Sequence, residues 1–111
     1  MVLLADELVV RAYRATRGFP MEERFGLQAQ IRRAAVSVPT NIVEGCARRT
    51  LRDYLHFVGI AIGSASEVRY LVGVSHRLGF LDEGASSDLT NGYSELVRGL
   101  QTLIRSLESR A

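Results

Sequence analysis

Arginines that could bind phosphate gather in the first half of this chain. All 14 basic residues are arginines. Nine arginines and five acidic residues give 1–52 a balance of +4, whereas five arginines and seven acidic residues give 53–111 a balance of −2. Because a guanidinium matches a phosphate group, an exposed cluster indicates nucleic-acid contact. The predicted contacts are Arg32, Arg33, Arg48, Arg49 and Arg52. No aromatic residues alternate with them to stack on bases, and salt-bridged surface arginine is the alternative interpretation.

Short polar side chains recur at helical spacing where a surface helix usually carries Glu and Lys. Serine and asparagine have poor helix propensity, so their place in mid-helix needs a reason. We predict a structural polar layer between helices, with arginines as partners for its carboxylates. The predicted members are Ser37, Asn41, Glu44, Ser64 and Glu67. A site that recognises a ligand is the alternative.

Residues that could support catalysis are few. Asp53 and His56 resemble one Glu-x-x-His pair of a di-iron bundle, but such a site needs two pairs and further glutamates. Cys46 has no histidine nearby in sequence, so we expect a small packed residue. We therefore expect no enzymatic activity, no catalytic residue, no metal and no cofactor. A metalloenzyme built on Asp53 and His56 is the weakest alternative.

Length and composition indicate one folded domain over residues 1–111. Hydrophobic residues make up 47% and charged residues 23% of the chain, which is typical of a folded protein. The single cysteine excludes an internal disulfide. No apolar run approaches the roughly 20 residues that span a bilayer, and no secretory signal is recognisable. We expect a cytoplasmic protein without membrane contact.

Helical periodicity predicts the elements that must position these side chains. The expected helices span 2–17, 20–47, 51–78 and 83–109. Pro20 suits the first turn of a helix, Thr50 and Asp82 suit N-caps, and Gly79 suits a helix end. Short connections between four helices predict an all-α, antiparallel up-down-up-down bundle.

Two of the expected helices are more apolar than one bundle requires. The second carries an extra apolar line formed by Ala29, Val36, Val43 and Ala47. The third is apolar around most of its circumference over 57–62, and Gly59 and Gly63 would let another helix approach closely. Because a bundle of this size has no central helix, we predict self-association into a homo-oligomer.

Two groups of residues carry a resemblance to a known family. The first group is Phe19-Pro20, Glu23, Phe25-Gly26-Leu27, Gln30, Arg33-Ala34-Ala35, Ser37, Asn41-Ile42 and Glu44-Gly45. The second group is Tyr54, Phe57, Ala61, Gly63-Ser64, Glu67 and Leu78-Gly79-Phe80-Leu81. On these residues, nearly the whole chain resembles the bacterial four-helix-bundle family of 23S rRNA intervening-sequence proteins. The expected helix 83–109 is similar in pattern only.

This resemblance implies a bundle that assembles as a ring, typically a homopentamer, with no established enzymatic activity. A related branch comprises accessory proteins of diversity-generating retroelements, which are strongly basic and bind nucleic acid and a reverse transcriptase. This chain departs from that branch, because its net charge is only +2. From the resemblance and the arginine cluster together, the expected function is a non-enzymatic oligomer that contacts RNA or DNA. The alternative is a protein–protein assembly or adaptor module, whose partner could be a reverse transcriptase or another protein.

Overall fold

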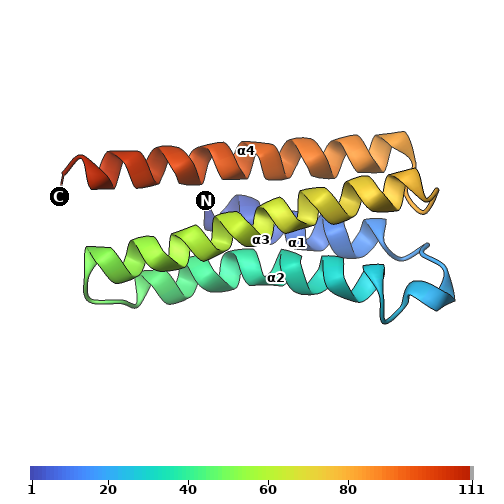
Figure 1. Ribbon diagram of the computed structural model, residues 1–111, viewed down its shortest axis with the longest axis horizontal. Coiled ribbons are helices and arrows are strands. Elements are labelled where there is room, and N and C mark those ends of the chain that lie inside the picture. The colour runs from blue at the N-terminus through green and yellow to red at the C-terminus, as the bar shows by residue number, and fades with distance from the viewer. Residues whose placement is uncertain (111) are drawn as a thin grey trace.

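A computed structural model describes residues 1–110, which form four α-helices and one 3-10 turn without any strand. The elements are α1 (Val2–Ala15), η1 (Met21–Glu23), α2 (Leu27–Cys46), α3 (Leu51–Arg77) and α4 (Glu83–Glu108). The helices lie side by side along one long axis, in a molecule measuring 47 × 22 × 19 Å (Figure 1). Four helices and no strand in this part of the chain confirm the all-α prediction.

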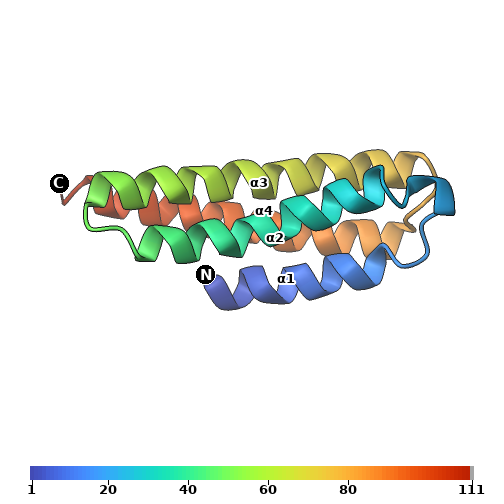
Figure 2. The same cartoon turned by 90° about the horizontal axis from the view of Figure 1, so that it is seen from below.

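Each helix has two neighbours. α2 packs against α3 and α3 against α4, while α1 contacts both α2 and α4. Figure 2 shows that the short α1 begins midway along the molecule, beside the longer helices. α1 therefore covers only one half of the bundle, and α2, α3 and α4 enclose the other half.

The core follows the apolar pattern of the sequence. On α4, four residues at heptad-like steps are fully or almost fully buried: Leu89, Tyr93, Leu96 and Leu100. α1 approaches α4 closely at two glycines, where Leu8 lies over Gly92 and Met1 lies over Gly99. A Cβ atom at Gly92 would come within 2.5 Å of Leu8 Cδ2, so these small residues let the two helices meet.

Three predicted helix ends are confirmed. The Thr50 side chain accepts a hydrogen bond from the Asp53 amide at 3.1 Å and begins α3. The Asp82 carboxylate accepts one from the Ala85 amide at 2.8 Å and begins α4. After α3, Gly79 has a φ of +83°, which is the left-handed conformation that glycine adopts without strain.

The predicted start of the second helix is wrong. Pro20 is extended, with ψ at 148°, and is followed by the separate turn η1. The helix begins only at Leu27, after Gly26 with φ −105° and ψ −115°. Glu23 lies at the positive end of α2, where its Oε1 atom accepts a hydrogen bond from the Leu27 amide at 3.0 Å. The capping carboxylate thus reaches the helix from the preceding turn.

α3 leaves part of its apolar surface uncovered. No heavy atom would lie within 4 Å of a Cβ atom at Gly59 or Gly63, apart from the helix's own backbone and adjacent residues. No other helix of the chain therefore uses these glycines for close approach. By length and composition alone α3 could cross a membrane, a test that core helices of soluble proteins also pass. Only 33% of its most apolar window is buried.

Candidate nucleic-acid interface

Three predicted phosphate contacts meet at the turn between α2 and α3. α2 ends at Cys46 and the Thr50 cap begins α3, so the short connection places Arg48, Arg49 and Arg52 together at one end of the bundle (Figure 1). All three arginines are exposed. The guanidinium carbon of Arg48 lies 4.6 Å from the centre of the Phe57 ring, a cation–π contact that orients this side chain.

The arginines of this turn carry uncompensated charge. Within residues 1–110, the ion pairs join Arg11 to Glu7 and Asp88, and His76 to Glu83. None of them involves an arginine of the α2–α3 turn. A surface of three exposed guanidinium groups without a carboxylate partner attracts phosphate.

Arg32 does not join this surface. Its Nε atom donates a hydrogen bond to the buried Thr16 Oγ1 at 3.0 Å, and Nη2 donates to the Tyr13 carbonyl at 3.1 Å. Its guanidinium carbon also lies 4.5 Å from the centre of the Tyr13 ring. Arg32 thus attaches α2 to the end of α1, and a nucleic-acid contact at this residue stays a prediction.

Arg33 is exposed but separate from the arginines of the turn. It lies on α2, 13 residues before the last residue of that helix, Cys46, which corresponds to about 20 Å along the helix axis. The structure therefore brings three of the five predicted contacts together at one end.

We expect Arg32→Gln to lower the free energy of unfolding by about 1–2 kcal/mol, because it removes two hydrogen bonds and a cation–π contact. Urea denaturation followed by circular dichroism measures this change. RNA affinity, measured in parallel on the folded variant, should stay at the wild-type value. A variant as stable as wild type but weaker in RNA binding would restore Arg32 to the interface.

Three of the five residues predicted for the polar layer are joined. Ser37 Oγ on α2 and Ser64 Oγ on α3 are hydrogen-bonded at 2.8 Å. Asn41 Nδ2 donates to the Ser37 carbonyl at 2.8 Å and to Ser37 Oγ at 3.0 Å. The serines and the asparagine thus satisfy one another across the α2–α3 contact.

The two carboxylates predicted for this layer lie outside it. Glu44 and Glu67 are exposed, so their charges remain in water and need no arginine partner. Arg69 instead donates hydrogen bonds to Ser66 Oγ and Ser94 Oγ, each at 3.3 Å, and so links α3 to α4. The prediction placed both glutamates correctly on their helices but on the wrong side of them.

Gly45 is a structural residue of this region that the sequence indicated only as part of the family resemblance. It is buried where α2 meets α3, and a Cβ atom there would lie 3.1 Å from Phe57 Cβ and 3.3 Å from Tyr54 Cδ1. Its missing side chain lets the two helices approach just before the arginine-bearing turn. This packing role depends on Tyr54 and Phe57 of α3, so the sequence around Gly45 could not reveal it.

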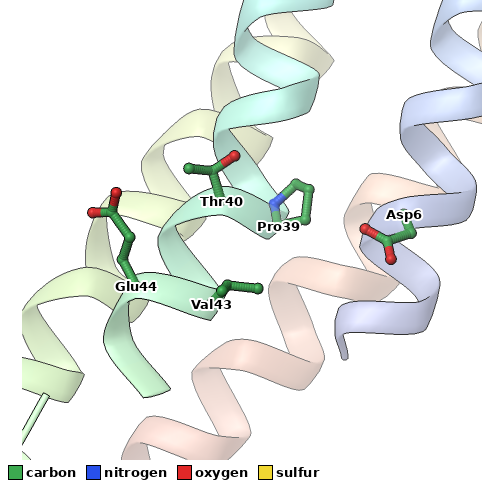
Figure 3. A pocket seen from close by; sticks show the side chains of 5 residues that line it. All are labelled: Asp6, Pro39, Thr40, Val43 and Glu44. Atoms are coloured by element: carbon green, nitrogen blue, oxygen red, sulfur yellow. The ribbon is translucent and has the colours of Figure 1, made fainter. Parts of the chain in front are cut away.

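A pocket between α1 and α2 was also not predicted. Figure 3 shows Asp6 of α1 facing α2 across this space, which occupies about 460 Å³. Its lining from α2 comprises Pro39, Thr40, Val43 and Glu44. Thr40 donates its hydroxyl proton to the Val36 carbonyl at 2.8 Å. Pro39 and Val43 face Asp6 across this space, whereas the Glu44 side chain points away from α1 (Figure 3).

The residues considered for catalysis are Cys46, Asp53 and His56. Cys46 is exposed, so the expectation of a packed thiol is wrong. Burial, and secondarily the nearby Cys46, raise the pKa of the Tyr54 phenol. Asp53 and His56 are both exposed. No group of three or more His, Cys, Asp or Glu side chains that could hold a metal ion occurs among the described residues.

Comparisons with known proteins agree with this fold. A family model described as 23S rRNA-intervening sequence protein matches residues 2–102. A crystal structure of a protein of unknown function from the S23 ribosomal protein family of Bacteroides thetaiotaomicron is similar, with a TM-score of 0.84 and 22% identity. The alignment covers 93% of this chain and 96% of that chain, and at this identity it shows the fold alone. No curated protein matches the chain.

Proposed function

The chain belongs to the 23S rRNA-intervening sequence protein family, and from this premise we propose that it is a non-enzymatic oligomer that binds RNA. The observation that carries the proposal is the exposed, unpaired cluster of Arg48, Arg49 and Arg52 at the α2–α3 turn. Each guanidinium presents a planar set of donors to phosphate oxygens. The contact is electrostatic and independent of base sequence, because every nucleotide presents the same phosphate group.

Self-association would strengthen this weak surface. We propose an antiparallel up-down-up-down bundle that assembles as a ring-like homo-oligomer, with five subunits as the expectation from the family resemblance. Exposed apolar side chains on α2 and α3, including Val43 and Tyr70, support a covered face. A ring repeats the arginine cluster once per subunit, so several weak contacts act together on one RNA. The proposed setting is the cytoplasm, without membrane contact.

Filter binding to a single-stranded RNA at two salt concentrations tests the proposal. Wild-type affinity should fall steeply with salt, by about 0.7 log units per log unit of salt for each phosphate contact. Combining Arg48→Gln, Arg49→Gln and Arg52→Gln should weaken binding about tenfold at low salt, since exposed ionic contacts contribute about 0.2–1 kcal/mol each and about 1.4 kcal/mol corresponds to a factor of ten. The salt dependence should flatten at the same time.

A matched control removes the same charge elsewhere. Arg14, Arg77 and Arg98 are exposed on α1, α3 and α4. Replacing all three by glutamine changes the net charge equally but should reduce affinity much less than the variant of the turn. Equal losses would mean that net charge alone attracts RNA. No binding by the wild-type protein at low salt would end the proposal.

The alternative function is an assembly or adaptor module that binds protein and not RNA. The low net charge and the exposed Leu3, Met21 and Phe25 side chains favour it. A reverse transcriptase or another protein would be the partner. Affinity purification after nuclease treatment distinguishes the two functions: a single stoichiometric protein that survives nuclease supports the adaptor, whereas loss of all bound material with nuclease supports RNA binding.

A further inference from the structure

The α2–α3 turn has an aromatic ring beneath one of its arginines. The guanidinium carbon of Arg48 lies over the half-buried Phe57 ring, 4.6 Å from its centre. Phe57 lies on α3, after the last arginine of the turn, so the sequence does not interleave the two residue types. The packing of α3 against α2 brings them together. The surface proposed to bind RNA therefore contains a planar cation placed on an aromatic ring.

Both members of this pair are held by neighbouring contacts. The Arg48 amide donates a hydrogen bond to the Gly45 carbonyl at 3.1 Å, which fixes the backbone just after α2. A Cβ atom at Gly45 would lie 3.1 Å from Phe57 Cβ, so α2 closes tightly against the base of the Phe57 side chain. The His56 ring contacts the Phe57 ring in a T-shaped arrangement, with 5.6 Å between the centroids and 79° between the planes. The pair is thus organised before a ligand binds, which lowers the entropy lost on binding.

The outer side of the Arg48 guanidinium is open to a ligand. Arg48 is exposed, and its side chain takes part in none of the hydrogen bonds or ion pairs within residues 1–110. Arg32 provides a contrast, because it also lies over a ring, that of Tyr13, but donates its hydrogen bonds to Thr16 and to the Tyr13 carbonyl. Arg48 therefore retains its N–H donors for a phosphate oxygen and one flat side for a second planar group.

We propose that Arg48, supported by Phe57, is a stacking platform for one unpaired base of a single-stranded RNA. The base lies on the open side of the Arg48 guanidinium, while Arg49 and Arg52 contact the neighbouring phosphates. This inference rests on the proposed RNA binding and names the class of RNA. In a duplex the flat faces of the bases are covered by their neighbours, so the platform can accept a base only from a single strand, a loop or an end. Stacking does not read the edges of a base, so it adds affinity without base specificity.

Filter binding of the wild-type protein to three RNAs with equal numbers of phosphates tests the platform. A duplex has a higher charge density than a single strand, so phosphate contact alone favours the duplex. Stacking should instead make the single strand bind about fivefold or more tightly than the duplex. A single strand without bases keeps its phosphates and should bind about fivefold or more weakly than the intact strand. Equal or tighter binding of the duplex, or unchanged binding of the strand without bases, would overturn the platform.

Variants that preserve charge locate the contact. Arg48→Lys removes the planar guanidinium and should weaken binding to the intact single strand about fivefold. Its binding to the strand without bases and its salt dependence should stay at the wild-type values, because the charge is kept. Phe57→Leu removes the ring under Arg48 and should also weaken binding to the intact strand more than to the strand without bases. Circular dichroism checks that both variants fold.

The matched control is Arg52→Lys. Arg52 is exposed at the same turn but lies over no aromatic ring within residues 1–110, so this variant should change affinity less than about twofold. The same loss in Arg48→Lys and Arg52→Lys would contradict a platform at Arg48. A steep salt dependence without any preference for the intact single strand would remove the platform and leave the proposed RNA binding in place. A wild-type protein that binds none of the three RNAs would remove both.

Discussion

Gly45→Val is expected to lower the free energy of unfolding by about 1–3 kcal/mol, since overpacking a closed contact forces side chains and backbone apart. A Cβ atom alone would lie 3.1 Å from Phe57 Cβ and 3.4 Å from the Tyr54 carbonyl oxygen. These atoms belong to or adjoin the backbone of α3 and cannot rotate away. Valine adds two further carbons at the same place, so α2 and α3 must separate at the end that carries the arginines.

Urea denaturation of two glycine variants measures this effect against a control. Gly63→Ala on α3 meets nothing within 4 Å and should gain about 0.5–1 kcal/mol from helix propensity. Gly45→Ala receives the same gain but also the crowding, so it should fall between Gly63→Ala and Gly45→Val. A Gly45→Val protein as stable as wild type would mean that α2 and α3 do not meet closely at this residue.

Two substitutions of Tyr93 are expected to change the free energy of unfolding in opposite directions. It is completely buried on α4, and its hydroxyl is a buried polar group without a hydrogen-bond partner in residues 1–110. Tyr93→Ala should cost about 3–5 kcal/mol, because it empties the centre of the core. Tyr93→Phe keeps the ring and removes the unpaired hydroxyl, so stability should rise by about 1 kcal/mol. Denaturation at neutral pH measures both, and a destabilised Tyr93→Phe would reveal a partner for the hydroxyl.

The same residue makes stability depend on alkaline pH. Burial raises the pKa of the Tyr93 phenol above its ordinary value of 10.0. The folded state therefore holds this proton more tightly than the unfolded state. The resulting stability is fully present below about pH 10 and is lost as pH rises towards the folded pKa, by up to about 1.4 kcal/mol per pH unit. Tyr93→Phe should lose less stability than wild type between about pH 9 and 11, and parallel profiles would contradict this assignment.

Helix existence and helix ends were predictable because they depend on local chemistry. The Thr50 and Asp82 side chains reach amides only three residues away, and Gly79 supplies its own backbone conformation. The buried apolar line of α4, formed by Leu89, Tyr93, Leu96 and Leu100, follows from their helical spacing, because a helix buries such an apolar face against its neighbours. Pro20 shows the limit of such reasoning, since it suits the start of a helix but here precedes a separate turn. Gly26 then sets where α2 begins.

The candidate site was predictable only in part. Arg48, Arg49 and Arg52 lie within five residues, so proximity in sequence guaranteed proximity in space. Arg32 has the same side chain, but only the packed structure places Tyr13 and Thr16 of α1 beside it. The Arg32 guanidinium therefore stabilises the contact between α1 and α2. The residue type alone does not indicate these partners.

Four helices, most of their ends, the buried apolar line of α4 and the basic turn after α2 could all be predicted from the order of residues. Each of these follows from interactions within a few residues or from helical period. The packed helices were needed to show that Ser37 meets Ser64, that Glu44 stays in water, and that a pocket opens opposite the first half of α1. These features depend on how far one helix is rotated and spaced against another. The rotation and spacing of the helices are set by how their side chains pack and by points of close approach, such as the contact of α2 with α3 at Gly45.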